Sequence, residues 1–273
     1  MVSQEQRRRQ LAREKFLRQQ QRRTSARRKT RMRNSVIASV LGVIVIGSVA
    51  LYTTGVLKSD DKKTDVSAQT TPSAPPTSKA PDPCEKPAAG SIKKQSWKTE
   101  PAMSIDTSAK YTMKLATTCG DIGIALKTSA APHTVNSFDF LAGKGFFDHT
   151  KCHRLTTNGI YVLQCGDPTG LGSGGPGYTI PDENLKDPSL KGNKYPAGTV
   201  AMANTGQKHT GGSQFFLVYK DSPLPPNYTP FGTIDAAGLK VLDKIAAAGE
   251  STGAGDGAPN ATVVINKATV TKS

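Results

Sequence analysis

Two stretches of this chain carry most of its structural information: CHRLTTNGIYVLQCGD at 152–167 and MANTGQKHTGGSQFF at 202–216. In both, short apolar runs alternate with glycine-containing turns, which is the pattern of strands joined by tight connections. Arg154 adds a permanent cation to the first stretch, because a guanidinium group stays protonated in proteins. The two stretches therefore predict strands, and the first of them carries a fixed cation.

The same pattern extends over residues 104–273. Short apolar runs predict strands at YTMKLAT, GDIGIAL, IYVLQCG, GTVAMAN, SQFFLVY, YTPFGTI and ATVVINKATV. Two other segments predict helices: 134–142, which follows Pro132, and 238–248, which ends before Gly249. About 170 residues of this kind form one β-rich domain of ordinary size.

The positive charge of the chain is concentrated at its N-terminus. Residues 1–34 contain 13 of the 36 Lys and Arg residues and only two acids, Glu5 and Glu14. A sequence pI of about 9.7 is compatible with nucleic-acid binding. The basic segment runs directly into an apolar segment, however, and has no base-reading signature, so we expect no nucleic-acid partner.

Residues 35–57, SVIASVLGVIVIGSVALYTTGVL, predict a single transmembrane helix. They contain no charged residue, and about 20 helical residues cross a bilayer core. The preceding cations predict a cytoplasmic N-terminus and an extracytoplasmic remainder, in a single-pass protein of the cell membrane. A cleaved signal peptide is the alternative, although the apolar run exceeds the usual ~7–15 residues. The basic tail either binds anionic lipid headgroups or only sets the orientation.

Residues 58–103 are rich in Pro, Ser, Thr, Ala and Lys and contain few side chains that would fill a core. They predict a disordered linker, in which Trp97 is a candidate for docking on the domain. The predicted organisation is therefore a basic cytoplasmic tail (1–34), a transmembrane helix (35–57), a linker (58–103) and a folded domain (104–273).

Five motifs stand in a fixed order along the domain: PHTVNSF (132–138), CHRLTT with VLQCGDPTG (152–170), GSGGPGY with DENL (172–185), MAN with GGSQFF (202–216) and LPPNYTPFG (224–232). Over residues 108–271 this order resembles the cyclophilin family of peptidyl-prolyl cis-trans isomerases. The resemblance implies a mainly β fold, an eight-stranded antiparallel closed β-barrel capped by two α-helices.

The resemblance also implies an enzyme that isomerises X–Pro bonds. The uncatalysed reaction is slow because amide resonance resists twisting, so a catalyst must favour the twisted state. In that state the prolyl nitrogen becomes pyramidal and gains a lone pair, which a hydrogen-bond donor can stabilise. Arg154 is the predicted catalytic donor, because its guanidinium is charged and rigid.

The remaining site residues are predicted to bind the substrate: Tyr161, Val162, Gln164, Asn204, Gln214, Phe216, Leu224 and Tyr228. The apolar and aromatic residues would surround the proline ring, and the amides would hold the polar parts of the substrate. Two extra residues between Arg154 and Gln164 leave open whether Ile160 or Tyr161 lies on the pocket floor. The competing hypothesis is a module of the same fold that binds proline-containing partners with little turnover.

Four cysteines follow the predicted span: Cys84, Cys119, Cys152 and Cys165. In an oxidising compartment they predict two disulfides, with three possible connectivities. Cys152 and Cys165 flank the predicted site hairpin and are candidate partners, which leaves Cys84 for Cys119; four free thiols are the alternative. No spacing of cysteines or histidines indicates a metal site, and we expect no metal and no cofactor.

The expected substrates are proline-containing polypeptides, such as secreted or wall-associated chains emerging at the outer face of the membrane. We expect the protein to act as a monomer.

Overall fold

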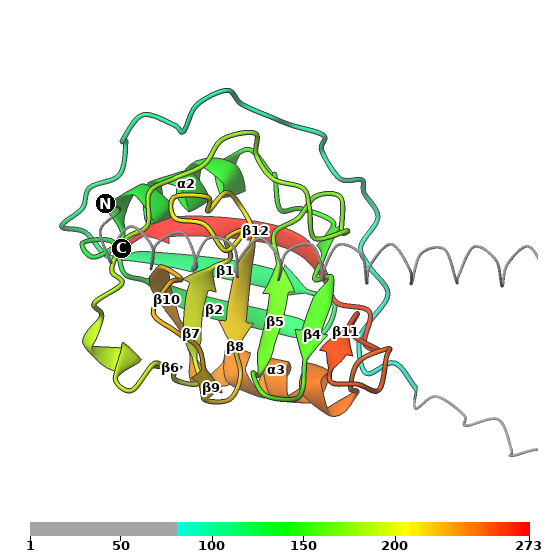
Figure 1. Ribbon diagram of the computed structural model, residues 1–273. Coiled ribbons are helices and arrows are strands. Elements are labelled where there is room, and N and C mark those ends of the chain that lie inside the picture. The colour runs from blue at the N-terminus through cyan, green and yellow to red at the C-terminus, as the bar shows by residue number, and fades with distance from the viewer. Residues whose placement is uncertain (1–80) are drawn as a thin grey trace, which may run out of the picture. The chain divides into compact units, whose positions relative to one another are not determined.

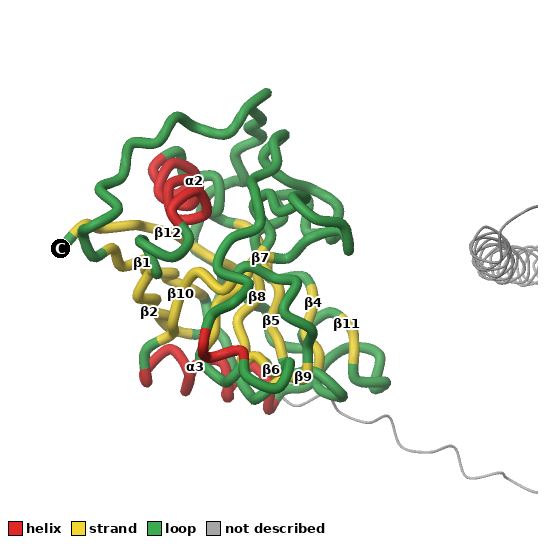
Figure 2. The backbone as a smooth tube through the Cα atoms, turned by 60° about the vertical axis from the view of Figure 1, so that its left-hand side comes forward, coloured by secondary structure: helices red, strands yellow, loops and turns green. Residues whose placement is uncertain are grey.

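The computed structural model describes residues 81–273, which form a mainly β domain with two α-helices (Figures 1 and 2). The strands are β1 (Tyr111–Thr117), β2 (Gly120–Leu126), β3 (Thr150–Lys151), β4 (Arg154–Thr156), β5 (Val162–Cys165), β6 (Lys194–Tyr195), β7 (Thr199–Met202), β8 (Phe215–Val218), β9 (Ser222–Pro223), β10 (Pro230–Ile234), β11 (Asp256–Gly257) and β12 (Val264–Lys272). The helices are α2 (Pro132–Gly143) and α3 (Ala236–Ala247), with a short 3-10 helix, η1 (Pro188–Leu190).

Ten strands form one curled antiparallel sheet in the order β11-β4-β5-β8-β7-β10-β2-β1-β12-β3, and β6 pairs separately with β9. Within residues 81–273 no ladder joins β11 to β3. The closed eight-stranded barrel expected from the resemblance is therefore corrected to a half-barrel of ten strands. The two strands beyond the expected eight, β3 and β11, are two residues long, lie at the ends of the sheet and come from segments without an apolar strand pattern.

The two predicted helices are confirmed, and each begins two residues earlier than expected. Pro132 occupies the first turn of α2, where its missing N–H costs nothing. The carboxylate of Glu183 accepts hydrogen bonds from the backbone N–H groups of His133 and Thr134, at 3.0 and 2.9 Å. Asp235 caps α3 by accepting from the N–H of Gly238. The helices lie on opposite sides of the sheet, α2 beside β12 and α3 beside β2 (Figure 1).

The central strands bury side chains on both faces. In β8, Phe215 and Leu217 belong to the main core, whereas Phe216 and Val218 belong to a smaller apolar cluster. This division follows from the alternation of side chains along a strand. The main core is centred on Phe138 of α2, whose ring packs on the rings of Phe147, Phe215 and Phe231. The smaller cluster lies on the other face of the sheet.

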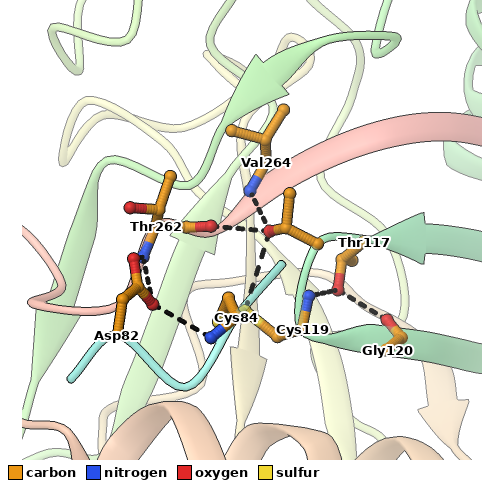
Figure 3. The surroundings of a disulfide bond; sticks show 8 residues. Asp82, Cys84, Thr117, Cys119, Gly120, Thr262 and Val264 are labelled. Carbon is orange, nitrogen blue, oxygen red and sulfur yellow. Dashed lines mark hydrogen bonds between the residues drawn. A yellow bond between two sulfur atoms is a disulfide. The ribbon is translucent and has the colours of Figure 1, made fainter. Parts of the chain in front are cut away.

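Residues 81–103, which we call the strap, contain no helix or strand but pack on the domain as the cyan trace in Figure 1. A disulfide joins Cys84 to Cys119 in the turn between β1 and β2, where Asp82 accepts hydrogen bonds from the N–H groups of Cys84 and Thr262 (Figure 3). Further along, the Trp97 ring packs against two phenylalanine rings, those of Phe140 and Phe146. The expected disordered linker is therefore corrected for residues 81–103, because these anchors hold them on the domain.

The predicted cytoplasmic tail (1–34), transmembrane helix (35–57) and first part of the linker (58–80) lie outside the described residues. Among residues 81–273, no helix has the length and apolar character needed to cross a bilayer.

Candidate active site

The candidate site is built on one row of residues that crosses four neighbouring strands. Arg154 of β4 lies opposite Gln164 of β5, and Gln164 lies opposite Phe216 of β8. Ala201 of β7 continues the row opposite Phe216. Residues that are directly opposite in antiparallel strands project to the same face. A cation, an amide and an aromatic ring therefore meet on the face that carries the smaller apolar cluster.

The guanidinium of Arg154 is held by two partners. Its Nε and Nη2 atoms donate to the two carboxylate oxygens of Asp256, each at 2.7 Å, and Nη1 donates to Oε1 of Gln164 at 3.2 Å. The hydrogen bond to Asp256 raises the pKa of Arg154 above its ordinary value. A guanidinium has five N–H donors, so two remain for a ligand, one on each Nη atom.

Amide hydrogen bonds extend this arrangement away from Arg154. Nε2 of Gln164 donates to Oε1 of Gln214 at 2.8 Å, and Nε2 of Gln214 donates to the carbonyl of Gly174 at 2.9 Å. The orientation of Gln164 is thus fixed from both ends. Its carbonyl faces the arginine and its amino group faces Gln214.

A pocket of about 180 Å³ lies beside Arg154. It is lined by Arg154, Ile160, Val162, Gln164, Ala203, Asn204, Phe216, Leu224 and Tyr228. Seven of the nine predicted site residues are therefore brought together around one cavity. A small pocket with an apolar wall and one cation matches the chemistry expected for holding a proline ring.

Aromatic contacts shape the wall of this pocket. The Phe216 ring meets the Tyr228 ring edge to face, with centroids 5.4 Å apart. The hydroxyl of Tyr195, which is fully buried, donates to the carbonyl of Tyr228 at 2.7 Å and accepts from its N–H at 3.1 Å. Burial raises the pKa of Tyr195 to about 12, so this hydroxyl stays protonated. Tyr228 is consequently fixed at the pocket border by its own backbone.

Tyr161, one of the two candidates for the pocket floor, does not line the pocket. Its ring packs edge-on against Tyr219 and lies 4.6 Å from the ammonium group of Lys220. Ile160 lines the pocket instead, together with Val162. Val162 and Gln164 are two residues apart in β5 and share a face, whereas Ile160 lies in the bend that precedes the strand.

A larger groove of about 930 Å³ adjoins the pocket and shares Gln164, Ala203 and Asn204 with it. Gln214, the remaining predicted site residue, lines this groove. Other walls come from the glycine-rich loop at 172–179 and from residues 98–100 of the strap. Asn204 lies at the junction of the two cavities, where its amide donates to the carbonyl of Asn227 at 2.9 Å.

The glycine-rich loop is organised by Asp167, whose side chain is fully buried. Its carboxylate accepts from the N–H groups of Thr169, Gly172 and Ser173 at 2.7, 2.6 and 2.9 Å. Burial favours the neutral acid, but hydrogen bonds, foremost from Gly174 and Thr169, outweigh it and lower the pKa of Asp167 to about 2. The carboxylate is therefore ionised and holds the groove wall in place.

His153 lies next to Arg154 without sharing its contacts. Both ring nitrogens are buried and have no hydrogen-bond partner among residues 81–273. Burial lowers the pKa of His153, although Asp167 opposes this effect. The imidazole is therefore neutral near pH 7.

A second disulfide joins Cys152 to Cys165 across the hairpin that carries Arg154 and Gln164. With Cys84–Cys119 it resolves the connectivity that the sequence left open, and all four cysteines are paired. In the described part of the chain, no group of three or more histidine, cysteine or acidic residues is arranged to hold a metal ion.

Two residues at the site, Asp256 and Ala203, were not predicted from the sequence. Ala203 lies in the quoted MAN motif, directly before the predicted site residue Asn204, but its small side chain has no group that indicates a role. Asp256 is 102 residues away from Arg154 in a glycine-rich segment. Nothing in the local sequence indicates that it reaches the arginine.

Comparisons with known proteins agree with this geometry. The family model "Cyclophilin type peptidyl-prolyl cis-trans isomerase/CLD" matches residues 112–270. A protein of Mycobacterium leprae named "Probable peptidyl-prolyl cis-trans isomerase B" is 48% identical over 203 residues, which are 70% of this chain and 63% of that protein. A peptidyl-prolyl cis-trans isomerase of Helicobacter pylori is 42% identical over 133 residues, which are 48% of this chain and 77% of that protein.

Among solved structures, a cyclophilin type peptidyl-prolyl cis-trans isomerase of Cryptosporidium parvum aligns with a TM-score of 0.50 and 26% identity. The alignment covers 60% of this chain and 99% of that one. The chain spans less than two thirds of the length of the mycobacterial relative.

Proposed function

Because the chain belongs to the cyclophilin-type peptidyl-prolyl cis-trans isomerase family, we propose that it catalyses the cis-trans isomerisation of X–Pro bonds in polypeptides. The single observation that supports this most directly is the position of Arg154, which has two N–H groups unused and lines a pocket of about 180 Å³ that also has an apolar wall. This chemistry needs no nucleophile and no cofactor.

Catalysis follows from stabilising the twisted imide more than either planar form. With the proline ring against Phe216 and Leu224, the ring is held while the acyl side rotates. As the bond twists, the prolyl nitrogen gains a lone pair, and an N–H of Arg154 donates to it. A preorganised donor of this kind accounts for about 100- to 1000-fold in rate.

The polypeptide would continue from the pocket into the larger groove. Gln164 and Asn204 line both cavities, so they are suited to hold the substrate backbone on the carbonyl side of the proline. Gln214 and the strap residues 98–100 line the groove further on. The groove therefore has room for several substrate residues that precede the proline.

We further propose that the enzyme is anchored in the cell membrane by residues 35–57 and acts at its outer face on secreted or wall-associated chains. Two disulfides in the domain support an oxidising compartment. The cations of residues 1–34 support a cytoplasmic N-terminus and offer contacts for anionic lipid headgroups. Labelling of an engineered cysteine at residue 20 or 70 in intact cells tests this: only the residue-70 variant should react with an impermeant reagent.

The activity is tested with the full chain in detergent and a peptide containing Ala-Pro, by measuring cis-trans exchange with NMR. The wild-type protein should accelerate exchange, and Arg154→Ala should lower turnover much more than it lowers peptide affinity. If the wild-type protein binds the peptide but does not accelerate exchange, the competing function is supported, a module that binds proline-containing partners with little turnover.

A further inference from the structure

The carboxylate of Asp256 makes the shortest contacts to the predicted catalytic arginine. Both of its oxygens accept from Arg154, at 2.7 Å from Nε and 2.7 Å from Nη2. A bidentate pair of this kind fixes the plane of the guanidinium as well as its position. The hydrogen bonds from Arg154 also lower the pKa of Asp256, so the carboxylate remains charged.

The backbone around Asp256 is arranged to present this side chain. The residue belongs to β11, which pairs with β4 so that Asp256 lies opposite Thr156. Thr156 and Arg154 are two residues apart on one strand, and a diagonal neighbour across a sheet is within reach of a long side chain. Asp256 therefore approaches Arg154 from the edge of the sheet, beside the pocket rather than inside it.

A second carboxylate holds the loop that carries β11. Glu250 accepts from the N–H groups of Thr252 and Gly255, at 2.6 and 2.8 Å. Gly255 has a φ of +93° and packs on Asn158, where a Cβ would lie only 2.5 Å from the Asn158 Cβ. Only glycine suits both the backbone conformation and the close approach. The position of Asp256 is thus determined by its own loop.

An ordinary surface ion pair on the same domain provides a contrast. Lys114 and Asp121 make a single contact of 2.7 Å, with both side chains more than half exposed. Such pairs contribute little, because water screens them and the side chains move. The carboxylate of Asp256 is also exposed, at 55%, but Arg154 is only 39% exposed and makes two bonds to Asp256 and a third to Gln164. The three bonds together leave the guanidinium one orientation.

We propose that Asp256 is a positioning residue, which holds the guanidinium of Arg154 so that its two unused N–H groups face the pocket. The inference rests on the proposed isomerase function. Asp256 does not line the pocket, so it acts through Arg154 rather than on the substrate. Without it, the guanidinium would rotate about its side-chain bonds, and a small misplacement of a catalytic group costs rate.

The test compares full-chain Asp256→Ala and Asp256→Asn with Asp121→Asn, which removes the surface pair. We expect Asp256→Ala to lower kcat/KM about 10- to 30-fold, mainly through kcat, with KM changed less than about twofold. Asp256→Asn should fall between it and the wild type, because an amide oxygen accepts one bond. Asp121→Asn should be unchanged. Hydrogen exchange of the Arg154 Nε–H with solvent, followed by NMR, should accelerate only in the Asp256 variants.

The results distinguish the positioning role of Asp256 from the isomerase function of the protein. In an Arg154→Ala background, Asp256→Ala should have no further effect on kcat/KM, because the pair acts as a unit. A further loss there, or wild-type kcat in Asp256→Ala, would overturn the positioning role while leaving the isomerase function intact. An equal loss in Asp121→Asn would also overturn it. A wild-type protein without activity would refute the isomerase function itself, and the positioning role with it.

Discussion

The site hairpin (152–165) and the strap (81–103) are each cross-linked by a disulfide, but they depend on it differently. In the hairpin, the strand ladder already joins Arg154 to Gln164 and Leu155 to Leu163, and β5 pairs in turn with β8. The strap has no strand pairing within the described residues, and most of it is exposed. Where backbone pairing fixes the geometry, a disulfide adds stability; where pairing is absent, the disulfide also keeps the segment in place.

The disulfide is not the only contact that holds the strap on the domain, because Trp97 is a second anchor. The N–H of Trp97 donates to the carbonyl of Pro176 at 2.8 Å, and Gly177, at a φ of +92°, leaves no room for a Cβ beside the Trp97 carbonyl. The strap is therefore fixed at both ends, by Cys84 and by Trp97. Only its second anchor touches the loop that walls the groove.

Removing the strap disulfide with Cys84→Ala and Cys119→Ala should have the largest effect on stability. The bond closes a 35-residue separation, and a loop of that size predicts a loss of about 4 kcal/mol in the free energy of unfolding. Hydrogen exchange should show faster amide exchange at Glu85, whose N–H bonds to Thr118. The kcat/KM for a short peptide should stay within about twofold of wild type. Unchanged exchange at Glu85 would mean that pairing-free segments do not need their cross-link.

Removing the hairpin disulfide with Cys152→Ala and Cys165→Ala should cost less. Its separation of 13 residues predicts about 3 kcal/mol by the same entropic argument. Because the ladder remains, amide exchange of β4 and β5 should change only as much as global stability does. Preferential loss of protection in these two strands, measured by hydrogen exchange, would show that the disulfide rather than the ladder holds the site.

Arg154→Lys should change the chemistry of the hairpin without changing its fold. The ammonium keeps the charge but loses the planar fork that pairs with Asp256. We expect kcat/KM to fall about tenfold or more, with the melting temperature within about 2 °C of wild type. Lys114→Ala, at an exposed position of β1, is the control and should behave like the wild type. Full activity of Arg154→Lys would show that charge alone suffices.

A smaller effect should appear on acidification, through His153. Its pKa in the folded protein lies below the ordinary value of 6.5, chiefly because of burial. The folded state therefore binds this proton less readily than the unfolded state, and stability is lost as the pH falls below about 6.5. Arg154 and Lys151 add to this effect, whereas Asp167 opposes it. Denaturant titrations at pH 7.5 and 5 should show a smaller drop for His153→Gln than for wild type; equal drops would exclude this histidine as a source.

The features of the fold and site that could be predicted from the sequence are those set by residues close together in the chain. The β-rich class and both helices follow from apolar spacing and from Pro132 and Gly249, which act within a few residues. The sequence leaves the floor residue open between Ile160 and Tyr161, because two extra residues separate Arg154 from Gln164, and the folded bend before β5 places Ile160 at the pocket. The half-barrel was not predictable, because β3 and β11 are two-residue strands created by their neighbours.

Contacts between residues far apart in the sequence could not be predicted. Asp256 reaches Arg154 because β11 pairs with β4, which is a property of the folded sheet. The strap, read from composition as a disordered linker, is ordered by Cys84 and Trp97, whose partners lie elsewhere in the chain. The membrane helix, by contrast, has a purely local signal and stays a prediction.

The alternate residues of strand β8 belong to two different apolar clusters. Phe215 and Leu217 point to the main core, while Phe216 and Val218 point to the smaller apolar cluster, from which Phe216 lines the pocket. The main core and the smaller apolar cluster are thus built from alternate positions of the same four-residue segment. A substitution at Phe216 would therefore change the lining of the pocket while leaving the main-core residues Phe215 and Leu217 in place.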